Sequence, residues 1–248
     1  MASALEHLRT ELGSVISGTG TGREVADRLC LACVDLLAVD GAAISMVYDG
    51  YSHGTFGASS AASRRLDEYQ FTFGEGPCLD AAAAGETVMA PDLDAPSEQR
   101  WPGFAGAVLA EGVRAVFAMP IMITSTCVGA LDLFRERPGP LTPDHLAGGM
   151  LAAELATMPL LDLIASTRDD EQQAVDGGQD HLADLDRIEV YQATGMLIAQ
   201  LDVDAAEALV RLRGHAIATG QTASEVAWAI VERRLDLERD DLEDAGGR

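Results

Sequence analysis

Hydrophobic residues follow two different periods along this chain, and these periods predict which segments are strands and which are helices. Residues 41–48 and 51–58 have the composition of paired strands, and Asp49-Gly50 between them is a typical two-residue hairpin turn. Shorter apolar runs predict further strands at residues 87–89, 113–123 and 127–135.

Helical spacing predicts helices between these strands and at both ends of the same region, at residues 4–16, 21–38, 60–70, 105–111 and 143–165. Thr21, followed three residues later by Glu24, indicates an N-cap. Pro159 should bend or split the last helix, because proline has no N–H to donate. Strands with interposed helices predict an α+β domain over residues 1–165, in which helices cover one antiparallel sheet.

Helical spacing returns near the end of the chain and predicts three short helices within Arg187–Leu235. The spans Asp204–Glu207 and Thr222–Glu225 both have the spacing of a capping box at a helix start. Gly220 lies where the middle helix must end, at a position that favours a left-handed residue. Three helices of about a dozen residues can bury a core only by packing on one another.

The first of these helices has an apolar face with helical spacing, formed by Ile188, Tyr191, Gly195, Ile198 and Leu201 and widened by Val190 and Leu197. A glycine inside a helix costs about 1 kcal/mol relative to alanine. We interpret Gly195 as a point of close contact between helices. The alternative is that it exposes backbone to a ligand.

The remaining segments connect or extend these two regions. Residues 166–182 are acidic and polar and are predicted to be a linker. A second domain is expected at residues 183–240, followed by a disordered tail at 241–248. We also expect helices 143–165 and 182–201 to pair with their counterparts in a homodimer, because each has an apolar stripe.

Composition restricts the classes of function. The formal net charge is −23, distributed over both halves of the chain, and all 17 cationic residues are arginines. Such a chain is a poor candidate for nonspecific binding to nucleic acid or membrane, so any RNA binding must use a few local contacts. Neither a membrane span nor a signal peptide is evident, and a cytoplasmic location is expected.

Four cysteines are present, and their spacing predicts no metal site. Cys30 and Cys33 lie inside a predicted helix, and we interpret them as two small buried apolar side chains. Cys78 follows a Gly-Glu-Gly-Pro run, whose glycines allow backbone to approach a ligand closely. His7, His53, His145 and His181 have no metal-like partners in the sequence.

Several runs in the first region together resemble a GAF domain: GEGPCLDAAAAGETVMAPDL, RWPGF, GVRAVFAMPI and VGALDLF. The resemblance covers about residues 5–165. This region is similar in particular to the GAF domain that precedes an ANTAR domain in actinobacterial regulators. It implies that the domain senses a cue or mediates dimers. An unidentified small-molecule ligand is compatible with it, and no cofactor is required.

Candidates for a ligand pocket in that domain are one cysteine and its aromatic neighbours, Phe71, Phe73, Cys78, Trp101 and Phe104. The alternative is that these aromatic residues are ordinary core residues. A reactive thiol at Cys78, which precedes a predicted helix, is a further alternative. GAF-fold proteins include a thiol-dependent reductase of free methionine sulfoxide.

The last region resembles an ANTAR domain, over about residues 183–237. The resemblance rests on Gln192–Leu197, Glu207–Leu209, Leu212-Arg213 and Glu225–Ala227. That family is a three-helix RNA-binding module of transcription antitermination. Its members usually have lysine where this chain has Thr194, so one cation is missing from the surface that the resemblance would place against RNA.

Arginine suits phosphate and guanine edges, and unstacked RNA bases are read by planar side chains. The candidate RNA-binding residues are Arg187, Tyr191, Thr194, Gly195, Arg211, Arg213, His215, Arg233 and Arg234. For each arginine the alternative is a solvated ion pair with a nearby acid.

Taken together, these patterns predict a cytoplasmic, homodimeric regulator with no enzymatic activity. The two resemblances imply that its first domain senses an unknown cue and that its second binds a pair of hairpin loops in nascent RNA, which prevents terminator formation. The alternative is a dimeric ligand-binding or interaction module whose last domain no longer binds RNA. A thiol-dependent reductase is a third, weaker hypothesis.

Overall fold

The structure is a computed structural model, and it describes residues 2–48, 51–162 and 187–237. Contacts divide the chain into two compact units, residues 1–185 and 186–248. The predicted linker at 166–182, the predicted tail at 241–248 and the predicted turn Asp49-Gly50 lie outside the described residues. No helix of the described segments combines the length and hydrophobicity that crossing a membrane requires.

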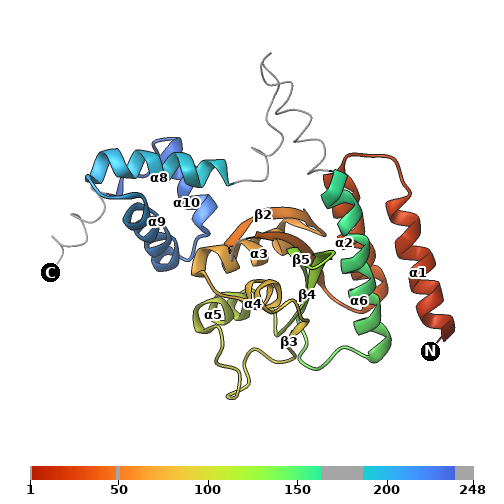
Figure 1. Ribbon diagram of the computed structural model, residues 1–248. Helices are drawn as coiled ribbons and strands as arrows, with labels where there is room; N and C mark the ends of the chain where they lie inside the picture. Colours follow the sequence, from red (N-terminus) through yellow and green to blue (C-terminus); the bar gives the residue numbers. More distant parts are fainter. Residues whose placement is uncertain (1, 49–50, 163–186, 238–248) are drawn as a thin grey trace, which may run out of the picture. The chain divides into compact units, whose positions relative to one another are not determined.

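The first unit is built on a five-stranded sheet in which every neighbouring pair of strands is antiparallel. In chain order the strands are β1 (Gly41–Tyr48), β2 (Tyr51–Ala58), β3 (Val88–Ala90), β4 (Ala115–Ile123) and β5 (Thr126–Arg135). Their order across the sheet is β2-β1-β5-β4-β3, which places β5 at the centre (Figure 1). The predicted α+β class is confirmed.

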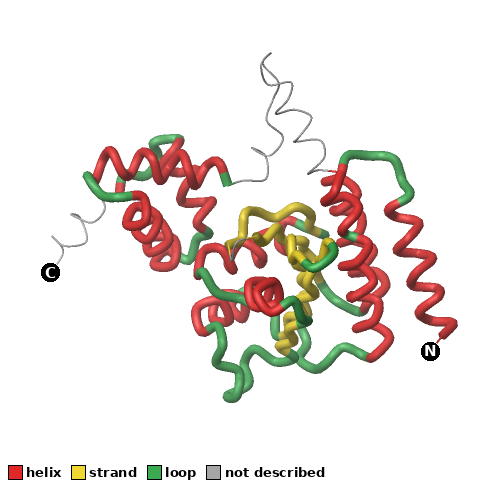
Figure 2. The backbone as a smooth tube through the Cα atoms, in the orientation of Figure 1, coloured by secondary structure: helices red, strands yellow, loops and turns green. Residues whose placement is uncertain are grey.

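Helices cover both faces of the sheet (Figures 1 and 2). One face carries α1 (Ala2–Ile16), α2 (Gly22–Leu37) and α6 (Pro143–Leu155). The other carries α3 (Ala61–Phe73), α4 (Pro77–Ala84) and α5 (Pro102–Ala110). Each side of the sheet has a hydrophobic core of its own, so the central strands are buried on both faces.

The alternation of side chains along β5 explains how one strand serves both layers. Leu131 and Leu133 belong to the core under α1, α2 and α6, whereas Phe134 belongs to the core under α3 and α5. Asp132, between the two leucines, therefore points to the same side as Phe134. It is a fully buried acid within an otherwise apolar strand.

Most predicted boundaries agree with the structure to within a few residues, and the exceptions have local causes. The third helix runs on to Phe73 because Gly74 ends it in the left-handed conformation, with φ 67°. The fifth begins at Pro102, since proline suits the first helical position. The predicted effect of Pro159 is confirmed as a split: α6 ends at Leu155, and helical residues resume at 157–162.

The second unit consists of α8 (Ile188–Leu201), α9 (Ala205–Thr219) and α10 (Ala223–Val231), each in contact with the other two. Thr222 and Glu225 form a full capping box, whereas Asp204 accepts from the Glu207 backbone N–H. Gly220 ends α9 in the left-handed conformation. The predicted helix starts and stop are thus confirmed, and local hydrogen bonds satisfy backbone groups at each of these helix ends.

The predicted apolar face of the first helix in this unit is wrong at two positions. The buried side of α8 is Val190, Ala193 and Leu197, while the Tyr191 side chain is 64% exposed. A Cβ placed on Gly195 would meet nothing within 4 Å, so this glycine is not a point of close helix contact. Both stripes have helical spacing, and packing against α9 and α10 selects one of them.

Candidate functional sites

The candidate arginines of the second unit differ in their surroundings. Arg187, at the start of α8, is only 6% exposed, and its Nη1 donates to Ser224 Oγ at 3.2 Å. This contact ties the beginning of α8 to α10. Arg187 therefore lies inside the unit and not on a surface that RNA can reach.

Two other arginines are exposed and paired with acids of their own segment. Arg211 Nη2 lies 2.6 Å from Glu207 Oε1, one helical turn away on α9, and Arg234 Nε lies 2.6 Å from Glu232 Oε2. Exposed ion pairs of this kind contribute about 0–1 kcal/mol, so an incoming phosphate can replace the carboxylate at little cost. These two guanidinium groups remain available to an anionic partner.

The other candidates of this unit lie on α8 and α9. Thr194 Oγ1 donates to the carbonyl of Val190 at 2.7 Å, so its hydroxyl is used within α8. Gly195, the next residue, is exposed with open space around it. Arg213 and His215 on α9 are half-buried. The exposed ring of Tyr191 lies one helical turn from Gly195 on the same side of α8.

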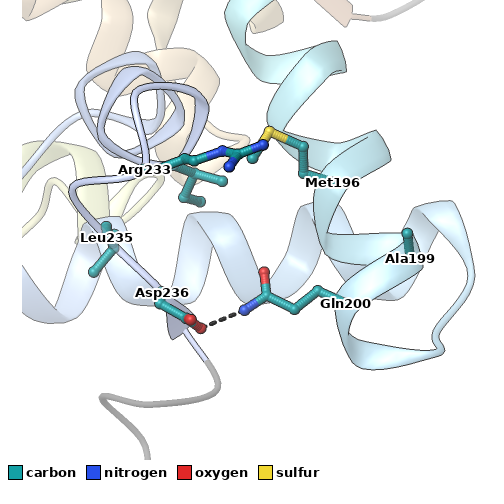
Figure 3. Close-up of a pocket in the computed structure, with 7 residues that line it drawn as sticks. Met196, Ala199, Gln200, Arg233, Leu235 and Asp236 are labelled. Carbon is teal, nitrogen blue, oxygen red and sulfur yellow. Dashed lines mark hydrogen bonds between the residues drawn. The ribbon is translucent and has the colours of Figure 1, made fainter.

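A groove of about 590 Å³ lies between α8 and the segment after α10 (Figure 3). It is lined by Met196, Ala199, Gln200, Ile230, Arg233, Leu235 and Asp236. Its volume is within the range of ligand sites. Of these residues only Arg233 was a candidate from the sequence, because the others are ordinary amphipathic-helix or loop residues.

Backbone geometry after α10 positions Arg233 at this groove. Arg233 has a left-handed φ of 57°, and the N–H groups of Arg234 and Leu235 turn back to the Ala229 carbonyl at 2.8 and 3.1 Å. Across the groove, Gln200 Nε2 donates to Asp236 Oδ1 (Figure 3). Within the described part of the chain, the Arg233 guanidinium has no carboxylate at ion-pair distance. This cation is thus available at the edge of a partly apolar groove.

In the first unit, three of the five predicted pocket residues come together, but in a packed core. Trp101 and Phe104 are buried and Phe73 packs against them. Trp101 Nε1 donates to Asp80 Oδ2 at 3.0 Å, and the Arg100 guanidinium stacks on its ring at 4.1 Å. These contacts fit the alternative of ordinary core residues.

The other two pocket candidates lie apart from that core. Phe71 is half-buried near the end of α3 and is not a member of the same cluster. Cys78 is fully buried in a small cluster with Val47 and Ala130. A thiol with no exposed surface is not placed to attack an external substrate in this conformation.

Around Cys78 lies a group of buried polar side chains that sequence reasoning missed. It comprises Ser45 of β1, Thr55 of β2, Asp67 and Gln70 of α3, and Asp132 of β5. The signal that could have found it is an acid inside an apolar strand, Asp132, together with polar residues on the inner face of α3. Because the members come from four elements, only folding brings them together.

Hydrogen bonds join this buried polar cluster into one network. Asp67 accepts from the Ser45 hydroxyl and, at 2.6 Å, from the Thr55 hydroxyl. Gln70 Nε2 donates to carboxylate oxygens of both Asp67 and Asp132. Gln70 Oε1 accepts from the backbone N–H of Cys78 at 2.7 Å.

Burial has the largest effect on the pKa of Asp132 in this cluster. Removal from water raises the pKa of Asp132 well above its ordinary value, and the nearby charge of Asp67 raises it further. The hydrogen bond from Gln70 acts in the opposite direction.

The predicted burial of the two remaining core cysteines is confirmed. Cys30 and Cys33 are fully buried in α2, and desolvation raises the pKa of Cys33 to about 12. Both thiols therefore stay protonated and act as apolar side chains.

Comparisons with known proteins agree with this division of the chain. The GAF domain family model matches residues 22–158, and the ANTAR domain family model matches residues 181–231. No curated protein matches the chain.

Among solved structures, the chain is similar to the GAF domain of an Acinetobacter phosphoenolpyruvate-protein phosphotransferase, at 12% identity and TM-score 0.50, covering 65% of this chain and 94% of that one. It is also similar to the GAF domain of a phosphoenolpyruvate-protein phosphotransferase from Coxiella burnetii, at 16% identity and TM-score 0.51, covering 69% and 98%. Likeness at such identity concerns the fold alone. Because the GAF match spans more than half of the chain, the protein belongs to the GAF domain family, and an ANTAR domain follows its GAF domain.

Proposed function

We propose that this protein is a cytoplasmic, signal-responsive regulator that binds RNA through its ANTAR domain and acts in transcription antitermination. The GAF domain senses a cue, and the ANTAR domain binds hairpin loops in nascent RNA, which prevents formation of a terminator. The observation that carries the proposal is the ANTAR match at residues 181–231, on three helices with an accessible, cation-bearing groove.

The surface that best supports RNA binding runs along α8 to the groove. Gly195 leaves backbone bare, so a nucleotide can approach closely, and the exposed Tyr191 ring offers a face for stacking. Met196 and Ile230 give the groove apolar walls, and Arg233 supplies the charge for a phosphate. This arrangement suits an unpaired base more than a duplex.

A gel shift with a two-hairpin leader RNA tests the proposal. We expect Arg233→Ala to weaken binding about tenfold or more, because one charge-assisted contact is lost. The matched control is Arg9→Ala, which removes the same charge from an exposed position of the first unit. Equal affinity of the two variants would reject this surface.

Salt dependence gives an independent reading of the same interface. The logarithm of affinity falls with the logarithm of salt by roughly 0.7–0.9 per neutralised phosphate. With Arg187 buried and a net charge of −23, we expect a shallow slope, equivalent to a few phosphates.

We also propose a homodimer, so that two ANTAR domains engage two hairpins at once and compensate for weak single contacts. Exposed apolar side chains on the helical layer of the first unit support it: Leu31 of α2, Met150 of α6, and Met158 and Leu161 beyond α6. Light scattering should give twice the chain mass of 26.1 kDa. Met150→Glu with Met158→Glu should yield monomers, and a monomeric wild type would refute the dimer.

The second candidate is an interaction module whose ANTAR domain does not bind RNA. It is favoured by Thr194 in place of a cation, by the burial of Arg187 and by the ion pairs of Arg211 and Arg234. A dimer that shifts no hairpin RNA at low salt would select this candidate.

A further inference from the structure

Three metal-ligating side chains meet inside the GAF domain. Asp67 of α3, Cys78 of α4 and Asp132 of β5 each bring one ligand atom, and these atoms all lie within 4.8 Å of one another. All three residues are fully buried. They therefore differ from the exposed acid clusters that occur on any acidic protein surface.

One carboxylate oxygen of this group lacks a hydrogen-bond partner among the described residues. Asp132 Oδ2 accepts from Gln70, but within the described residues Asp132 Oδ1 is buried without a hydrogen-bond partner. An unsatisfied buried acceptor destabilises the folded state, and more so when it is charged. Such a group in a folded protein calls for an ion or a water molecule.

Charge at the site points to an ion. The hydrogen-bond donor to the buried Asp132 carboxyl group is the neutral amide of Gln70. A neutral donor satisfies a lone pair but does not compensate a buried negative charge, which needs a cation or a proton.

We propose that Asp67, Cys78 and Asp132 bind a divalent first-row transition-metal ion inside the GAF domain. A thiolate with two carboxylates suits borderline ions such as Zn²⁺, Fe²⁺ and Co²⁺ and is unfavourable for Mg²⁺ or Ca²⁺. Bonds of about 2.0–2.3 Å place tetrahedral ligand atoms roughly 3.5 Å apart. The observed 4.8 Å limit therefore requires a contraction of about 1.3 Å at most.

Gln70 holds the three ligands in this arrangement. Its amide nitrogen donates to Asp67 and Asp132, and its oxygen accepts from the Cys78 backbone N–H. Gly76 lets the backbone pass close to the Gln70 side chain, since a Cβ on Gly76 would lie 2.4 Å from Gln70 Oε1. Its φ of 151° also suits glycine. Gln70 is thus a positioning residue of the site.

The site goes beyond the proposed regulatory function, because it makes a divalent transition-metal ion, or a small molecule bound to that ion, the candidate cue. Three protein ligands leave a fourth position of a tetrahedral ion open to a small molecule. Binding releases the Cys78 thiol proton to solvent.

Cobalt titration of the full-length, reduced, metal-free protein tests the proposal, because a Co²⁺–thiolate bond has a near-ultraviolet charge-transfer band. We expect the band in the wild type and in Cys127→Ser, which alters a partly exposed thiol outside the cluster. It should disappear in Cys78→Ser. In Asp132→Asn, the Co²⁺ affinity should fall at least tenfold.

Several results would overturn the proposal. They are a wild type without the band, a band that persists in Cys78→Ser, or unchanged affinity in Asp132→Asn. If the wild type binds no Co²⁺ and Asp132→Asn raises Tm, a proton and not a metal ion neutralises the Asp67–Asp132 pair. Circular dichroism checks that both variants fold. Hairpin binding plays no part in the readout, so this proposal and the RNA proposal fail separately.

Discussion

The two units differ in where their unusual side chains lie: these side chains are buried in the GAF domain and exposed in the ANTAR domain. The GAF domain buries two carboxylates, an amide and a thiol between its sheet and α3 and α4. Among the described residues, the large apolar side chains exposed by the GAF domain are leucines and methionines, whereas the ANTAR domain exposes the aromatic rings of Tyr191 and Trp228 together with Val210 and Ile217. A five-stranded sheet covered on both faces can enclose a polar cluster, whereas three short helices bury one side each and must leave the rest in water.

The contrast indicates where each unit meets its ligand. A buried, incompletely satisfied acid suits a small ligand that reaches the interior, while exposed rings and a bare glycine suit a large partner on the outside. The predictions below alter one unit at a time, with a control that leaves the same unit otherwise intact.

Thiol labelling should show the largest difference. Cys127 is partly exposed, whereas Cys33 and Cys78 are fully buried and react only when the domain opens. For an opening free energy of about 5 kcal/mol, labelling of the buried thiols is slower by nearly four orders of magnitude. Mass spectrometry of each cysteine measures it, and fast labelling of Cys78 would revive a redox role.

In the ANTAR domain, Leu212→Ala should destabilise by about 2–5 kcal/mol, because it empties a fully buried position. Val210, two residues away on α9, is 67% exposed, so Val210→Ala should change stability by no more than about 0.5 kcal/mol. Hydrogen exchange of residues 188–237 measures both. Similar effects of the two changes would mean that an unseen partner buries Val210.

In the GAF domain, Gln70→Ala should cost about 1–3 kcal/mol, because it removes the side-chain acceptor of the Cys78 N–H and a donor to both buried carboxyl groups. Gln99→Ala is the control, since Gln99 donates to a neighbouring carbonyl on an exposed loop. Urea denaturation measures the difference. A neutral Gln70→Ala would show that the buried network adds nothing to stability.

The pH dependence of stability should carry a contribution from Cys33. Its folded pKa of about 12 lies above the ordinary value of about 8.5, so the unfolded chain loses its proton first. The stabilisation is present below pH 8.5 and is lost as pH rises towards 12.

Between pH 7.5 and 9.5 the free energy of unfolding should therefore fall by about 1.4 kcal/mol through this thiol. Cys33→Ala should show a correspondingly smaller fall in urea titrations at the two pH values. Identical slopes for wild type and variant would refute the assignment.

Local patterns predicted the elements of both units well, because helix and strand starts depend on nearby residues. The capping residues Thr21 and Thr222 and the stop at Gly220 act through hydrogen bonds or dihedral preferences within one turn. The hairpin strands likewise follow from local composition and from the Asp49-Gly50 turn signal between them.

The surroundings of the candidate site residues were harder to predict, because they depend on contacts between distant segments. Arg187 looked like a surface cation until packing placed it against Ser224, 37 residues later. The buried polar cluster joins Asp67 to Asp132 through Gln70, and neither acid has a sequence neighbour that reveals the other.

By itself, the amino-acid sequence determined the order of helices and strands, the two families it resembles and its strong negative charge, since these depend on composition and local spacing. Only the tertiary structure decided which face of α8 is buried, which arginines remain outside and which acids meet within the sheet layer. Those choices arise when distant segments compete for the same interior, where each buried polar group must find a partner.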